Sequence, residues 1–240
     1  MHLAGANIAD GRWNAKRKKE IRDSRVLGTS LIAATLAAME KKPAVFVAAS
    51  AIGFYGETGA SAVDESGPAG QGFLAEVCTA WEEAAQPAAD AGIRTVNLRI
   101  GVVLSTRGGA LARMIPPFKF GLGGVVGSGR QYVSWVTLGD VCRAIRHCIE
   151  SESISGPVNA VAPEAATNRE LTKALGKALK RPTLFPVPAP AVSLMFGEMG
   201  RELLLASTRV KPDALLRDRF AFEHPQIDEA VVGVLNAERG

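Results

Sequence analysis

The architecture of this chain can be inferred from the stretch Val45-Phe46-Val47-Ala48-Ala49-Ser50-Ala51-Ile52-Gly53-Phe54-Tyr55-Gly56. It opens as an apolar run without a turn residue, which is typical of a strand buried on both faces of a parallel sheet. In open α/β sheets, ligands bind just beyond the carboxyl ends of the strands. Ser50 falls at that end, and the glycines after it let backbone approach a ligand closely. The pattern predicts a ligand site at Ser50, although an ordinary strand that ends in a serine-containing turn would look the same.

The composition is that of a globular protein, with 47% hydrophobic and 22% charged residues among 240. This length is enough for one domain with a small appendage. Much of the net charge of +4 comes from Lys16-Arg17-Lys18-Lys19, which we interpret as a solvated helix face because no nucleic-acid-binding module accompanies it. No stretch reaches the ~18 apolar residues that a membrane span needs. We therefore expect no nucleic-acid partner and no membrane partner.

Cysteine usage bears on the redox compartment. The chain has three cysteines, Cys78, Cys142 and Cys148, and no CxxC pair. An odd number in this arrangement predicts neither a disulfide framework nor a zinc site. A reducing, cytoplasmic localisation is the expectation that fits it.

Hydrophobic periodicity and turn residues predict alternating strands and helices, and hence an α/β fold. The glycine-rich stretch 121–129 is not interpreted as a dinucleotide loop, because no buried strand precedes it and no amphipathic helix follows. The expected strands are 45–50, 94–104, 131–135, 158–161 and 220–222. The expected helices are 13–40, 73–91, 109–114 (ended by Pro116-Pro117), 141–150 (opened or capped by Asp140), 168–179 (with a capping box of Thr167 and Glu170), 191–206, a short helix after 211 and a closing helix to 235.

Several blocks of the sequence resemble one protein family. "ASAIGFYG" (49–56) is similar to the SSxxxYG segment of extended and atypical short-chain dehydrogenases/reductases, and "HLAG" (2–5), "SRVLGT" (24–29) and "RTVNLRIGVVL" (94–104) have counterparts there. The resemblance is to the epimerase-like branch that carries a C-terminal extension of the DUF1731 type. It implies a Rossmann-like parallel sheet with a small α+β substrate lobe. The implied domains are 1–181, with a substrate-side loop at 105–137, and the extension 182–240.

The resemblance also implies a nicotinamide cofactor, NADP or alternatively NAD. It would lie against residues from three predicted strands, namely Leu3, Ala4, Gly5, Ala49, Ser50, Arg99 and Gly101. In the family a glycine-rich turn that holds the pyrophosphate precedes the HLAG block, and this chain begins at that block. The sheet is therefore expected to be truncated on its N-terminal side, with cofactor binding weakened. Its open edge is expected to be a surface for a second copy of the chain.

The expected catalytic residues are Ser50 and Tyr55. The family's Tyr-x-x-x-Lys pair would fall within 73–78, "FLAEVC", where neither residue occurs. Ser50 would hydrogen-bond a substrate carbonyl, and Tyr55 would donate the proton if Arg99 lowered its pKa from about 10. Glu76 or a water molecule is the alternative donor, and Arg99 is equally well explained as half of a structural salt bridge.

Three further assignments concern the rim of the expected site. Gln131 and Trp135 are expected to line a substrate pocket. The acidic loop with Asp64 and Glu65 is either a solvated rim or a substrate contact. Asp140 is expected to be structural rather than catalytic, because Asp is favoured at helix starts.

The sequence thus leads to an NAD(P)-dependent epimerase or oxidoreductase acting on a nucleotide-sugar-like or small carbonyl substrate. A cofactor-binding or scaffold protein without catalysis is the alternative, since the usual Tyr-x-x-x-Lys pair is missing. A third hypothesis is an inactive fragment that lacks the phosphate-binding half of the cofactor site.

Overall fold

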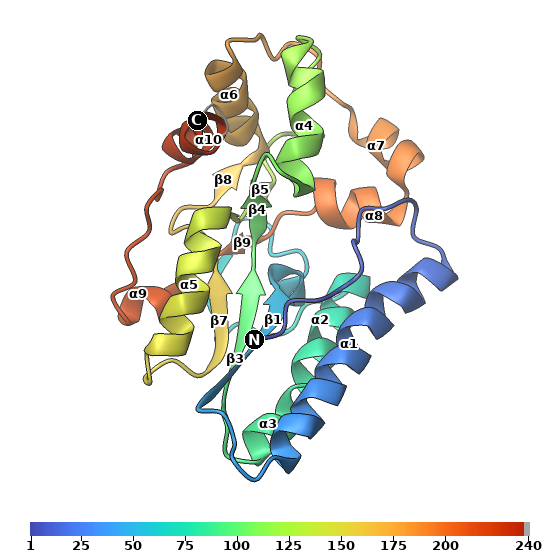
Figure 1. The fold of residues 1–240 in the computed structure, drawn as a ribbon. Helices are drawn as coiled ribbons and strands as arrows, with labels where there is room; N and C mark the ends of the chain where they lie inside the picture. Colours follow the sequence, from blue (N-terminus) through green and yellow to red (C-terminus); the bar gives the residue numbers. More distant parts are fainter. Residues whose placement is uncertain (238–240) are drawn as a thin grey trace.

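The computed structural model describes residues 1–237 and has an α/β architecture (Figure 1). Its central sheet contains β1 (Val45–Ala51), β3 (Arg94–Ile100) and β7 (Gly156–Ala160), all parallel, in the order β1-β3-β7. The core of β1 is buried on both faces, as its apolar run predicts. The register places Ser50, Arg99 and Asn159 side by side at the carboxyl end of the three strands.

The first residues extend this sheet beside β1. His2 pairs with Ala48 in parallel, with its N–H donating to the Val47 carbonyl and its own carbonyl accepting from Ala49, both at 2.9 Å. A Cβ on Gly28 would lie 3.3 Å from the His2 imidazole, so this glycine lets helix α1 (Ala15–Ala38) lie close to the edge segment. The HLAG block thus begins beside β1 with a single bridge at His2, and its residues 3–5 are exposed. That a second copy pairs with this edge stays a prediction.

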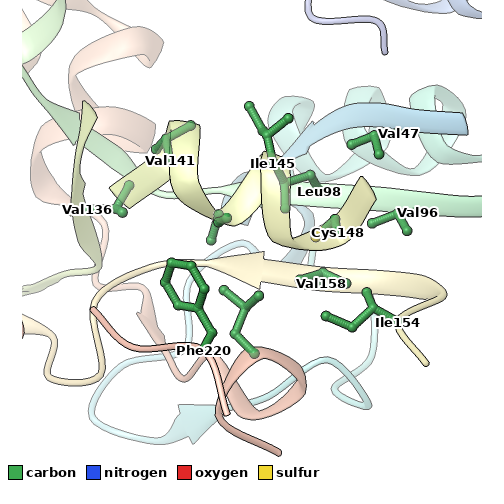
Figure 2. Close-up of a cluster of buried hydrophobic side chains, with 13 residues drawn as sticks. Val47, Val96, Leu98, Val136, Val141, Ile145, Cys148, Ile154, Val158 and Phe220 are labelled. Carbon is green, nitrogen blue, oxygen red and sulfur yellow. The ribbon is translucent and has the colours of Figure 1, made fainter. Parts of the chain in front are cut away.

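Helices cover both faces of the central sheet. On one face, α1 packs with α2 (Phe73–Glu83) and α3 (Gln86–Asp90), and the Trp81 indole N–H donates to Thr29 across α1 and α2. On the other face, α5 (Leu138–Glu150) packs its apolar stripe on β1, β3 and β7 (Figure 2). Phe220, just after α9 (Asp213–Arg217), fills the same cluster, so the C-terminal part of the chain contributes to the main core.

A second core lies beyond the carboxyl end of the sheet. It contains Trp135 together with buried side chains of helices α4 (Gly109–Lys119), α6 (Asn168–Leu179) and α10 (Ile227–Asn236). The elements of this part are short. They are β2 (Ala62–Val63), β4 (Val102–Leu104), α4 (Gly109–Lys119), β5 (Tyr132–Val133), β6 (Trp135–Thr137), β8 (Ala166–Thr167), α6 (Asn168–Leu179), α7 (Ala189–Phe196), α8 (Glu198–Gly200), β9 (Arg209–Val210) and α10 (Ile227–Asn236), with a 3-10 turn at Ile52–Tyr55 and a π-helical turn at Arg201–Leu205.

The boundary at 181/182 does not separate the chain into independent parts. β9 pairs in parallel with β2, and α10 packs on α6. The division into 1–181 and 182–240 therefore stays a prediction. No helix within residues 1–237 is long and apolar enough to cross a bilayer.

Several predicted elements needed correction where tertiary packing competes with local signals. The strand expected at 131–135 is divided into β5 and β6, and the helix expected at 73–91 breaks before Pro87. The helix expected at 191–206 breaks at Gly197, whose φ is +62°. The segment 220–222 is not a strand, because Phe220 turns into the core instead.

Helix α4 does not end before Pro116 but runs through both prolines to Lys119. A proline inside a helix removes one amide donor, which usually costs several kcal/mol. Here Leu111, Ile115 and Phe118 are buried along one face, and the proline carbonyls still accept hydrogen bonds from the residues that follow. Burial of that face therefore overrides the local break.

The N-cap of α5 is Thr137, not Asp140. The Thr137 hydroxyl accepts from the Asp140 amide and donates to the Asp140 carboxylate. That carboxylate is 1% exposed and also accepts from Arg143 and from the backbone of Glu223. Asp140 has a structural position, as expected, although one turn further into the helix than predicted.

The strand expected over 94–104 is divided at Gly101, where the chain leaves the central sheet and enters β4. A Cβ at this position would lie 2.6 Å from the Ser134 carbonyl oxygen and 2.7 Å from a Val161 methyl group. The contact with the Ser134 carbonyl cannot relax without moving backbone. Gly101 is therefore required for the close approach that joins the two cores.

Replacing Gly101 with alanine should lower the free energy of unfolding by about 2 kcal/mol, because overpacking a well-filled site forces backbone shifts. Gly139→Ala is the matched control, since the nearest atom to its Cβ would be at 3.6 Å. That variant should keep the stability of the parent or gain up to ~1 kcal/mol from helix propensity. Denaturant unfolding measures both, and equal losses would contradict this role of Gly101.

Candidate functional site

A buried polar cluster lies at the carboxyl end of the central sheet. It consists of Ser50 on β1, Tyr55 on the 3-10 turn, Glu65 in the following loop, Glu82 on α2, Arg99 on β3 and Asn159 on β7. Their proximity follows from the parallel register, which aligns Ser50, Arg99 and Asn159, and from α2 returning over the end of β1. The sequence predicted the convergence of Ser50, Tyr55 and Arg99, but not the other three members.

Arg99 and Glu82 form a bidentate ion pair at the centre of this cluster. Nε of Arg99 donates to Oε1 of Glu82 and Nη2 donates to Oε2, each at 2.8 Å. The Arg99 side chain is 4% exposed and that of Glu82 is 13% exposed, so both charges are largely removed from water. The guanidinium also stacks 3.5 Å from the centre of the Phe54 ring. Of the two interpretations of Arg99, the structural salt bridge is the one observed.

Ser50 points toward this ion pair. Its hydroxyl donates to Oε1 of Glu82 at 2.7 Å, and the residue is 2% exposed. The hydroxyl proton is therefore already used within the protein. The expected role of Ser50 toward a substrate carbonyl stays a prediction.

The Tyr55 hydroxyl joins the ion pair to Asn159. It accepts a hydrogen bond from Nη1 of Arg99 and donates one to Oδ1 of Asn159, both at 2.8 Å. Arg99 acts to lower the pKa of Tyr55, but burial has the larger effect and raises the pKa above its ordinary value. Arg99 opposes this rise without reversing it, so the net lowering of the pKa on which the expected donor role depends is not found. In this arrangement Tyr55 is a protonated hydrogen-bond donor.

Glu65 connects the cluster to the C-terminal part of the chain. Its carboxylate accepts from the Asn159 amide at 3.0 Å and from the Ala214 amide at 3.2 Å. Asn159 in turn donates from its side chain to the Lys211 carbonyl at 2.9 Å. Glu65 is 8% exposed. The sequence predicts either a solvated rim or a substrate contact for this loop. In the structure Glu65 instead accepts hydrogen bonds that fix Ala214, and through Asn159 it is linked to Lys211.

The residues expected along a cofactor fall into two groups. Leu3, Ala4 and Gly5 are exposed at the open edge beside β1. Hydrogen bonds from Arg25 to the Ala6 carbonyl and from the Ala6 amide to Ser24 fix the turn that follows. Ala49, Ser50 and Arg99 are buried, and Gly101 is the packing glycine at the end of β3. The first group alone offers an accessible surface.

The two residues expected to line a substrate pocket are buried, which corrects that interpretation. Trp135 is 1% exposed and is part of the second core, because its whole side chain is covered by apolar neighbours. Gln131 is 7% exposed, and its amide nitrogen donates to the carbonyls of Val126 and Leu204. Gln131 therefore fastens the glycine-rich loop to the turn at Arg201–Leu205.

Sequence reasoning missed Glu82 and Asn159 as members of the cluster. An arginine in an apolar strand requires a carboxylate partner, and this requirement is the one signal in the sequence for a residue such as Glu82. Several acidic residues precede Arg99 in the chain, so only the packing of α2 identifies the partner. Asn159 gives no signal in a single sequence.

Neither an ionised Cys78 thiol nor, within residues 1–237, a metal site accompanies the cluster. Burial raises the pKa of the Cys78 thiol to about 12, so this residue stays protonated at neutral pH. Within residues 1–237, no group of three or more His, Cys, Asp or Glu side chains is arranged to hold a metal ion. Hydroxyl, carboxylate and guanidinium groups are thus the chemistry that the cluster offers.

Comparison with known families agrees with this fold. A family model described as the NAD dependent epimerase/dehydratase family matches residues 1–160, and one described as a domain of unknown function (DUF1731) matches residues 187–232. Two curated relatives match almost the whole chain. "Epimerase family protein MT2273" of Mycobacterium tuberculosis is 46% identical over 96% of this chain and 76% of that protein, and human "Epimerase family protein SDR39U1" is 35% identical over 96% and 80%.

Solved structures give the same result. The crystal structure of human epimerase family protein SDR39U1 (isoform 2) with NADPH has a TM-score of 0.93 and 34% identity, covering 98% of this chain and 80% of that one. A nucleoside-diphosphate sugar epimerase from Corynebacterium glutamicum has a TM-score of 0.77 and 35% identity, covering 95% of this chain and 45% of that one. The chain therefore belongs to the NAD-dependent epimerase/dehydratase family, in the epimerase-like branch of atypical short-chain dehydrogenases/reductases that carries the DUF1731 extension.

Breaking the ion pair should be costly. Glu82→Leu leaves the buried Arg99 charge without its counter-ion, and Arg99→Met leaves Glu82 without its own, so each single variant should lower the free energy of unfolding by about 3 kcal/mol. The double variant Glu82→Leu with Arg99→Met removes both charges and should recover most of that loss, because a buried pair adds little over apolar packing. Denaturant unfolding of the two single variants and the double variant completes the cycle. Simple additivity of the single losses would show that the pair is not the unit of stability.

Proposed function

We propose that this protein binds a nicotinamide dinucleotide and acts as an NAD(P)-dependent epimerase or oxidoreductase on a nucleotide-sugar-like or small carbonyl substrate. The observation that carries the proposal is the convergence of Leu3–Gly5, Ser50 and Tyr55 at the carboxyl end of a Rossmann-like sheet. Family membership supports it. So does the similar fold of the human relative whose structure holds NADPH, which favours NADP over NAD for this chain.

The residues present fit part of such a cofactor. The segment Leu3–Gly5 is exposed and has small residues at Ala4 and Gly5, so a cofactor ring can approach its backbone. The fit does not extend to the diphosphate. The glycine-containing loop before α2 leads to a helix N-terminus, but the Glu202 carboxylate already accepts from the amides of Phe73 and Leu74. We assign no residue of this chain to the diphosphate.

When bound, a nicotinamide ring would supply or accept a hydride. The task left to this chain is to polarise a carbonyl and move a proton without the usual tyrosine and lysine, because Phe73 and Val77 are apolar. Ser50 has one hydroxyl proton, so it can donate to a substrate only by releasing Glu82. Glu82 would then keep both hydrogen bonds from Arg99. Tyr55 is the proposed proton donor, because its hydroxyl carries a proton and also accepts a hydrogen bond from Arg99.

A second candidate function is a cofactor-binding protein without catalysis. The observation that favours it is the burial of both proposed catalytic hydroxyls, with Ser50 2% and Tyr55 3% exposed and each already donating within the cluster. A cluster of this kind stabilises the fold whether or not chemistry occurs. Turnover separates the two candidates.

Cofactor binding tests the part common to both. NADPH should bind the 240-residue chain, and Ala4→Glu should weaken binding at least about tenfold, because a carboxylate beside an anionic dinucleotide is repelled. Ala34→Glu, at an exposed position within α1, is the matched control and should bind as the parent does. Calorimetric titration with NADPH and with NADH measures the affinities. Equal affinities in the two variants would remove Leu3–Gly5 from the cofactor site.

Turnover tests the catalytic proposal. In a screen of NADPH oxidation against sugar nucleotides and small carbonyl compounds, Ser50→Ala should lower kcat by about 100-fold or more with unchanged NADPH affinity, because one hydrogen bond to the reacting oxygen is lost. Tyr55→Phe should cause a similar loss if Tyr55 donates the proton. NADPH binding without turnover of any compound would instead support the non-catalytic candidate.

A further inference from the structure

Two loops distant in sequence lie side by side at the end of the molecule formed by α4 and α6 (Figure 1). One follows α4 and the other connects α6 to α7. Nε of Arg181 donates to the Lys119 carbonyl at 2.9 Å, and Val187 and Val125 pair through their backbones. The loops are so close that a Cβ on Gly124 would overlap the Phe185 carbonyl. They form one continuous surface.

This surface exposes four large apolar side chains, which we call the apolar tip. Phe120 is 80% exposed, Leu122 59%, Leu184 73% and Phe185 56%. The backbone that carries Phe120 and Leu122 has a defined turn, because the amides of Gly121 and Leu122 donate to the carbonyls of Phe118 and Pro117 at 2.9 Å. Water-exposed apolar groups that cluster on an ordered surface are characteristic of an interaction site.

The charges around the tip have one sign. Lys119, Lys180 and Arg181 are all exposed beside it. The wider segments 105–130 and 180–197 contain six basic residues and no acidic one, and of these six Arg113 is paired with Asp10. A partner must therefore offer apolar volume and negative charge at the same place.

We propose that the apolar tip docks this protein onto the surface of an anionic lipid bilayer. The four apolar side chains would enter the boundary between headgroups and acyl chains, while the three cations contact anionic headgroups. This is peripheral attachment, which does not require any helix within residues 1–237 to cross the bilayer. The sequence predicts no membrane partner, and the experiment below decides between that expectation and this proposal.

Other partners fit the same surface less well. A second copy joined by a two-fold axis through the tip would bring Lys119, Lys180 and Arg181 against their own copies, which like charges oppose. A nucleic acid would match the charge but not Leu122 and Leu184, since aliphatic side chains offer no stacking face. An anionic bilayer satisfies both features.

Vesicle flotation tests the proposal with the 240-residue chain. The protein should float with phosphatidylcholine vesicles that contain phosphatidylserine and much less with phosphatidylcholine alone. Leu184→Gln combined with Phe120→Gln should weaken flotation about tenfold or more, because each loses buried apolar area. Leu31→Gln is the matched control, since Leu31 is 70% exposed on α1, away from the tip, and it should float as the parent does. Lys119→Gln should weaken flotation at low salt. The difference between this variant and the parent should shrink as salt is added, because salt screens the charge.

A second readout needs no variant. Backbone hydrogen exchange with phosphatidylserine vesicles present should slow at 119–122 and 181–185 and stay unchanged around Leu31. Three results would overturn the proposal: no flotation with anionic vesicles, equal flotation of the double variant and the parent, or protection elsewhere. Binding to a single-stranded oligonucleotide that depends on Lys119 but not on Leu184, without vesicle binding, would assign a nucleic acid instead and equally overturn it.

Discussion

An arginine can lie within an apolar sheet only if its charge is compensated, and Arg99 on β3 is 4% exposed. Glu82 compensates it through two parallel hydrogen bonds, which fix the orientation of the guanidinium as well as its charge. Once this pair is formed, the remaining hydrogen-bonding capacity of Arg99 determines where Tyr55 lies, and Tyr55 in turn orients Asn159. The end of the sheet that faces the candidate site is thus arranged outward from one ion pair.

The charges around Arg99 differ from those that a Tyr-x-x-x-Lys pair on α2 would supply. A tyrosine and a lysine on the helix would place a positive charge beside a phenol at the site. Here α2 supplies a negative charge instead, and β3 supplies the positive one from below. The phenol that the charge reaches, Tyr55, comes from the turn after β1. Because that phenol is buried, its pKa rises despite the neighbouring cation. The positive charge beside the phenol therefore comes from β3 and not from α2.

How much of this could be predicted from the sequence depends on the range of the interaction. The apolar run of β1 and the capping box of Thr167 and Glu170 are local signals, and both are observed. Pro116 was misleading because burial of one face of α4 overrides a local break. Trp135 was misplaced because an aromatic in a polar strand fits a pocket and a core equally well. Pairings such as Glu82 with Arg99 arise from helix packing, and one sequence does not encode them visibly.

Glu65 and Asn159 reach past the sheet to the backbone at Lys211 and Ala214. The DUF1731 extension therefore completes the hydrogen bonding of the polar cluster. Without those residues, the Asn159 side-chain amide and one carboxylate oxygen of Glu65 would lose these partners in the interior. Loss of order in the extension would be transmitted into the centre of the Rossmann-like sheet, and the two parts would melt as one cooperative unit. In this protein, integrity of the far end of the chain is a precondition for a formed site.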